Sequence, residues 1–107
     1  TPPAANDLPA RWRAFELEEF PPACLGRPAG GMTCEQADAL AAACISTFLK
    51  QGRLDAECRT LLDGAIADLA HAMKDLESTD KAYFERLLNL AREVRIAAAG
   101  ADPIPPA

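Results

Sequence analysis

The sequence is poor in histidine, the residue that serves most often as a general base and as a metal ligand. Its 107 residues include one histidine, one tryptophan and one tyrosine. No C-x-x-C pair exists, which argues against zinc, because zinc is held by closely spaced Cys and His ligands. A Cys-His enzyme needs its thiol beside the imidazole, yet a helix through Cys58 and His71 directs these side chains to opposite faces. We therefore expect no metal, no cofactor and no enzymatic activity.

Long apolar runs and an excess of basic charge are also missing. No stretch of 18 or more apolar residues exists, so we expect no membrane span. Sixteen acidic and eleven basic residues give a net charge of -5. This charge disfavours nucleic acid and anionic membrane surfaces as partners, and it suits either solubility or a basic protein partner.

Apolar residues make up 50% of the chain and aromatic residues only 6%. Alanine is abundant, and this mixture is typical of helices. The sequence predicts an all-α fold, a small helical bundle of three main helices plus a short N-terminal helix, in a single domain 1–107. The expected elements are a loose leader 1–6, a short helix 7–20, a loop 21–32, helices 33–51, 55–77 and 79–99, and a tail 101–107.

Two of these helices form a hairpin with clear end signals. Thr33-Cys34-Glu35-Gln36 has the form of a capping box, and Gly52 supplies a residue that ends a helix in a left-handed conformation. Asp55 is placed to cap the next helix. Apolar positions recur at helical spacing along that second helix, at Leu54, Cys58, Leu61, Leu62, Ala65, Leu69, Met73 and Leu76. We expect the apolar faces of the two helices to pack on each other.

The four cysteines can be paired by geometry. Cys34 and Cys44 lie on one predicted helix about 15 Å apart, which is too far for a disulfide. Around the turn at Gly52, Cys44 lies opposite the region of Cys58. We therefore predict the disulfides Cys44–Cys58 and Cys24–Cys34, with four reduced core thiols as the alternative. Such bridges, and a chain that starts with Thr1-Pro-Pro rather than methionine, fit a mature periplasmic protein whose signal peptide has been removed.

The loop PPACLGRPAGGM, residues 21–32, is the least regular interior stretch. One interpretation is a simple connector. The other is a disulfide-pinned protrusion that loses little entropy when it enters a cleft of a partner. Its candidate partner-binding residues are Leu25, Arg27, Pro28, Gly30, Gly31 and Met32.

A second candidate surface lies on the back of helix 55–77, where small residues replace charged ones. This stripe consists of Thr60, Gly64, Ala67 and His71. Glycine inside a helix costs about 1 kcal/mol relative to alanine, so Gly64 suggests the close approach of another helix. His71 is interpreted as a solvated residue rather than a ligand or base.

The last helix has an apolar arc close to half its circumference, which is wider than one surface needs. The arc predicts either a homodimer or a set of edge-of-core residues. The candidate dimer residues are Tyr83, Leu87, Leu90 and Val94.

With its acidic helical composition, the cysteines Cys24, Cys34, Cys44 and Cys58 and the loop PPACLGRPAGGM, the chain resembles the small periplasmic immunity proteins that neutralise cell-wall amidase effectors of type VI secretion. The resemblance implies a protein that occludes the catalytic cleft of a secreted peptidoglycan amidase, commonly as a dimer. The alternatives are an exported helical adaptor or accessory subunit of an envelope assembly, and a periplasmic sensor domain.

Overall fold

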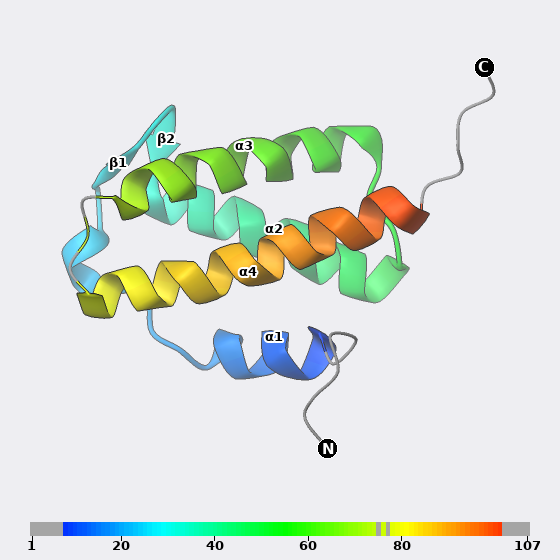
Figure 1. The fold of residues 1–107 in the computed structure, drawn as a ribbon, viewed down its shortest axis with the longest axis horizontal. Coiled ribbons are helices and arrows are strands. Elements are labelled where there is room, and N and C mark those ends of the chain that lie inside the picture. Colours follow the sequence, from blue (N-terminus) through cyan, green and yellow to red (C-terminus); the bar gives the residue numbers. More distant parts are fainter. Residues whose placement is uncertain (1–7, 75, 77, 102–107) are drawn as a thin grey trace.

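The computed structural model describes residues 8–74, 76 and 78–101, with residues 99–101 described by their backbone only. Four α-helices make up most of this part: α1 (Leu8–Glu16), α2 (Cys34–Gln51), α3 (Ala56–Met73) and α4 (Ser78–Ala101). Helices α2, α3 and α4 pack on one another, and α1 lies along α4 (Figure 1). The predicted bundle of three main helices with a short N-terminal helix is confirmed. Within the described residues, no helix combines the length and apolar character needed to cross a membrane.

The α2–α3 hairpin has the end signals expected from the sequence. The Thr33 hydroxyl accepts a 3.2 Å hydrogen bond from the Gln36 amide, and the Gln36 side chain accepts one of 2.9 Å from the Thr33 amide. Gly52 ends α2 at φ 76°. The Asp55 carboxylate accepts a 2.8 Å hydrogen bond from a first-turn amide of α3. These local interactions fix where the two long helices meet.

Three helix ends differ from expectation. The predicted helix 7–20 ends at Glu16, because the amides of Leu17 and Glu18 bond to carbonyls three residues back and tighten the last turn. Helix α3 ends at Met73, while the predicted end at residue 77 lies outside the described residues. Helix α4 continues through Gly100. The predicted leader 1–6 and tail residues 102–107 also lie outside the described part.

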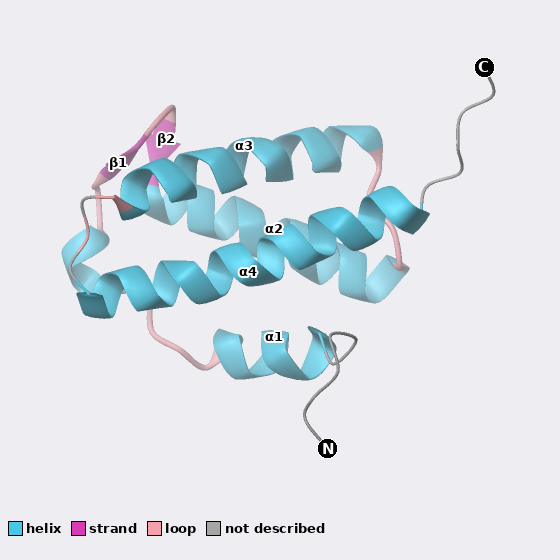
Figure 2. Cartoon of the chain, in the orientation of Figure 1, coloured by secondary structure: helices cyan, strands magenta, loops and turns pink. Residues whose placement is uncertain are grey.

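The loop 21–32 contains structure that the sequence did not reveal. A 3-10 turn spans Pro22–Cys24, and β1 (Pro28–Ala29) pairs antiparallel with β2 (Met32–Thr33) (Figure 2). Strands of two residues are too short to show an alternating apolar pattern, so the all-α prediction missed them. The β1–β2 hairpin packs on α2 and α3, because a two-stranded hairpin is not stable alone and needs a surface to pack against.

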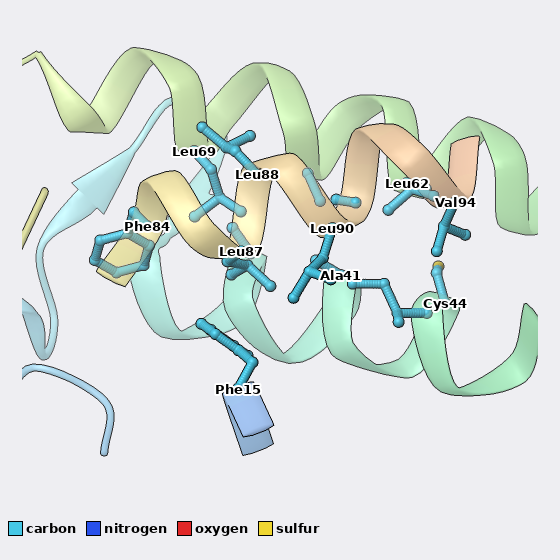
Figure 3. Packing of buried hydrophobic residues seen from close by; sticks show 14 of the residues in the cluster. Phe15, Ala41, Cys44, Leu62, Leu69, Phe84, Leu87, Leu88, Leu90 and Val94 are labelled. Carbon is cyan, nitrogen blue, oxygen red and sulfur yellow. The ribbon is translucent and has the colours of Figure 1, made fainter. Parts of the chain in front are cut away.

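The core explains the wide apolar arc of α4. Figure 3 shows side chains of α4 directed toward α2 and α3, with Phe15 of α1 approaching from the opposite side. The arc therefore packs against three neighbouring helices within one chain. On α3, Leu62 is buried and Leu61 is 42% exposed. The prediction of Leu61 as a core residue is wrong, because adjacent helical positions point about 100° apart and Leu62 takes the inward one.

Candidate functional site

The backbone of the loop between Cys24 and Cys34 is held by hydrogen bonds along its length. The Arg27 amide donates to the Cys24 carbonyl at 3.1 Å, and the Cys34 amide donates to the Arg27 carbonyl at 2.9 Å. Gly26 has a φ of +74°, and its amide donates a 2.6 Å hydrogen bond to the Glu35 carboxylate at the start of α2. The loop is therefore ordered before it meets any partner.

The side chains of this loop divide into an inner and an outer set. Cys24, Ala29 and Cys34 are completely buried. Of the six candidate binding residues, five are exposed, namely Leu25, Arg27, Pro28, Gly30 and Gly31, whereas Met32 is half-buried against the core. Leu25 is 61% exposed and is one of four large apolar side chains that are exposed among the described residues.

The tip of the β1–β2 hairpin packs against α3. Gly30 has a φ of +69°, and a Cβ atom at this position would overlap the carboxylate of Asp68 on α3. Figure 1 shows the hairpin beside the C-terminal half of α3. The protrusion expected from the sequence is therefore a loop docked on a helix, with one exposed flank.

The small-residue stripe of α3 is exposed over its length. Thr60, Gly64, Ala67 and His71 are all exposed, and no atom lies within 4 Å of a Cβ built on Gly64. Asp68 falls on the helical face between Gly64 and His71, since residues three and four apart are neighbours on a helix. Through Asp68 the stripe adjoins the hairpin tip, so the two predicted surfaces are brought together.

The candidate dimer residues are placed differently. Tyr83, Leu87, Leu90 and Val94 are all buried within the single chain. In this arrangement α1, α2 and α3 cover them, and they offer no exposed surface to a second copy. The edge-of-core alternative accounts for these four residues.

The four cysteines are free thiols in this structure, so the predicted disulfides are not formed in it. The members of each predicted pair nonetheless lie near each other: a charge on Cys34 contributes to the raised pKa of Cys24, and the Cys44 thiol donates a 3.6 Å hydrogen bond to the Cys58 carbonyl. Burial raises the pKa of Cys24, Cys34 and Cys44, and a hydrogen bond with Asp55 raises the pKa of Cys58. The thiols are therefore weak nucleophiles at neutral pH.

Polar contacts that hold α1 were not found from the sequence. The Arg11 guanidinium donates to the Glu93 carboxylate at 2.7 Å, and Arg86 pairs with Glu18. The first pair joins α1 to α4, and the second joins the segment that follows α1 to α4, in both cases across most of the chain. Long sequence separation leaves no local pattern from which either pair could be predicted.

The residues described here include no group of three or more His, Cys, Asp or Glu side chains placed to hold a metal ion. The polar groups of the loop and stripe are backbone amides, the Arg27 guanidinium, the Thr60 hydroxyl, the His71 imidazole and isolated carboxylates. Comparison with known protein families, curated proteins and solved structures gave no match for this chain.

Proposed function

We propose that this chain is an exported binding protein that inhibits a secreted enzyme by placing the 24–34 loop against it. The observation that carries the proposal is the combination of an ordered backbone with exposed Leu25, Arg27 and Pro28. A loop fixed before binding loses little conformational entropy when it is captured. Arginine is also enriched among the residues that carry most of the binding energy of an interface, and Arg27 lies on the exposed flank of this loop.

The specific form of the proposal is periplasmic immunity. The partner is a secreted peptidoglycan amidase, and the loop blocks its catalytic cleft by steric exclusion. The resemblance drawn from the sequence and the acidic net charge of -5 support this form. A homodimer stays a prediction, and the mass of the protein in solution tests it.

The test measures hydrolysis of peptidoglycan by a candidate amidase, which is to be sought among small secreted hydrolases encoded beside this protein. Leu25→Asp and Arg27→Glu, made together, are expected to abolish inhibition. Leu17→Asp and Arg92→Glu, made together at two exposed positions away from the loop, serve as the charge-matched control. Unchanged inhibition by the loop variant, or no inhibition by the wild-type protein, would contradict the proposal.

In the exported form we propose that Cys24–Cys34 and Cys44–Cys58 are disulfides, each formed when two thiols lose two electrons and two protons to the oxidants of that compartment. The closeness of each pair supports this. Each bridge is expected to add about 3 kcal/mol to the free energy of unfolding. Alkylation of the denatured protein, purified without reductant, should modify no cysteine. Four modified cysteines would overturn the disulfide proposal.

The exposed stripe on α3 favours a second candidate, an adaptor that binds a helix of an envelope assembly. Gly64 has no packing reason within the chain, and small residues allow close approach of a second helix. Gly64→Leu is expected to abolish such binding while leaving amidase inhibition by the loop intact. An assembly operon around the gene would favour the adaptor over the inhibitor.

A further inference from the structure

A cavity of about 260 Å³ lies between α1 and α2, away from the loop and stripe. Four aromatic side chains line it, although only 6% of the residues in the chain are aromatic. These are Trp12, Phe15, Phe20 and Tyr83. Helix α1, the segment that follows it and α4 each contribute to this set, so it arises only in the folded chain.

The four rings pack directly against one another. Phe20 stands at 78° to Tyr83 with ring centroids 5.9 Å apart, and Phe15 is tilted by 39° with centroids at 4.8 Å. Trp12 in turn stacks on Phe15 with ring centroids 5.7 Å apart, and Trp12, Phe15 and Tyr83 each keep only 6% of their surface exposed. The rings therefore form a tightly packed apolar wall of the cavity, which suits the hydrocarbon part of a ligand.

The charged side chains that line the cavity are all acidic. Glu16, Glu18 and Asp38 border the cavity, and none of the described residues that line it is a lysine or an arginine. The Tyr83 hydroxyl donates a 2.7 Å hydrogen bond to Asp38, which fixes this carboxylate beside the rings. Glu18 also pairs with Arg86, whose guanidinium belongs to a different cavity on the α4 side.

A positive group beside Asp38 would stabilise the charged form of its carboxylate. Asp38 is half-buried, and burial raises its pKa above the ordinary value, which shows that its charged form is poorly solvated. A cation beside it would replace the lost solvation. Glu16 is exposed at the rim, where it is placed to attract a cation from solution.

We propose that this cavity binds a cationic group on an apolar stem, either the ammonium end of a lysine side chain or a quaternary ammonium ligand. The rings contact the stem and the methyl or methylene groups, and Asp38 and Glu16 neutralise the charge. This inference goes beyond the proposed inhibition, because the loop plays no part in it. It assigns a ligand chemistry to the face of the molecule around α1.

The test uses Trp12 as the probe, because it is the only tryptophan in the chain. Its fluorescence is followed while the full chain is titrated with choline or with Nα-acetyl-lysine methylamide, in which the side-chain ammonium stays charged. The neutral analogues 3,3-dimethyl-1-butanol and N-acetyl-norleucine methylamide are matched controls. A saturable change with a cation, and a response at least tenfold weaker with its neutral analogue, is expected. Choline alone would indicate a small ligand, and lysine alone a protein side chain.

Charge-removing variants locate the site. Asp38→Asn and Glu16→Gln are each expected to weaken binding at least fivefold, whereas Glu19→Gln, an exposed neighbour that does not line the cavity, leaves it unchanged. Circular dichroism checks that each variant is folded, and Glu16→Gln keeps the test valid if Asp38→Asn is not. Failure of both cations to bind, equal binding of the neutral analogues, or unchanged affinity in folded Asp38→Asn and Glu16→Gln would each overturn the proposal.

Discussion

The Tyr83 hydroxyl donates a 2.7 Å hydrogen bond to the Asp38 carboxylate, and this contact joins α4 to α2 at the edge of the core. Burial raises the pKa of Tyr83, and the adjacent Asp38 raises it further, so the phenol stays a neutral donor. Burial also raises the pKa of Asp38, while the hydrogen bond from Tyr83 partly opposes that shift. The pair is a polar connection between two helices that otherwise meet through apolar side chains.

Removing the hydroxyl in Tyr83→Phe should lower the free energy of unfolding by about 1 kcal/mol, because the ring is retained and one hydrogen bond is lost. Urea denaturation measures the difference. A double-mutant cycle with Asp38→Asn provides the control: the two changes together should cost less than the sum of their separate effects. Strict additivity would show that the contact contributes no coupling energy.

Asp38 also predicts a pH dependence of stability. Burial raises the pKa of Asp38 above 3.8 in the folded chain. Between 3.8 and this higher pKa, the Asp38 carboxyl is protonated in a larger fraction of the folded molecules than of the unfolded molecules. The contribution of Asp38 to stability is therefore largest below 3.8 and declines as pH rises through the folded pKa. We expect the urea midpoint of wild type, measured relative to that of Asp38→Asn, to fall as the pH is raised from 3 to 7. The opposite slope would mean that the folded pKa is lowered.

Two glycines should respond to alanine in opposite directions. Gly64 is helical, and no atom lies within 4 Å of a Cβ built on it, so Gly64→Ala is expected to raise the free energy of unfolding by about 1 kcal/mol. Gly30 has a positive φ, and its Cβ would overlap Asp68. Gly30→Ala should therefore cost about 2 kcal/mol.

Thermal and urea unfolding of both variants check this pair of predictions. Gly26→Ala is a useful third member, because Gly26 has a φ of +74° with open space around it and isolates the backbone strain from the overlap. A cost at Gly30 no larger than at Gly26 would show that the contact with Asp68 is unimportant. A loss of stability in Gly64→Ala would contradict the open surface at that position.

Neighbouring residues at the end of α1 should differ sharply in their importance. Phe15 is buried and packs against Tyr83, whereas Leu17 is 89% exposed. Phe15→Ala is expected to lower the free energy of unfolding by about 3 kcal/mol, and Leu17→Ala to change it by less than about 0.5 kcal/mol. Equal effects in urea denaturation would show that α1 is not packed on α4 as described.

The features that could be predicted from the sequence are those that depend on residues close together in the chain. The caps at Thr33 and Asp55 and the stop at Gly52 each involve groups within four residues, so residue type and spacing were sufficient. The neighbouring positions of Cys44 and Cys58 follow from the same turn. That these cysteines form a disulfide stays a prediction.

The features that could not be predicted depend on contacts between distant segments. The arc on α4 suggested a second copy of the chain because nothing in the sequence shows that α1 packs on Tyr83 and Leu90. The docking of Gly30 on Asp68 likewise depends on how the hairpin folds back. Five of the eight described residues that line the cavity beside α1 lie within residues 12–20, but Asp38 and Tyr83 join them only through the packing of α2 and α4.

The docking of the hairpin on α3 separates the loop into two parts with different tolerance to mutation. Ala29 and Gly30 are fixed by their fit to the helix, whereas Leu25 and Pro28 are exposed and contribute little to that fit. Substitutions at the exposed positions therefore alter the chemistry of the outer face of the loop without disturbing its fit to the helix. The surface character of this loop is separable from the stability of the fold.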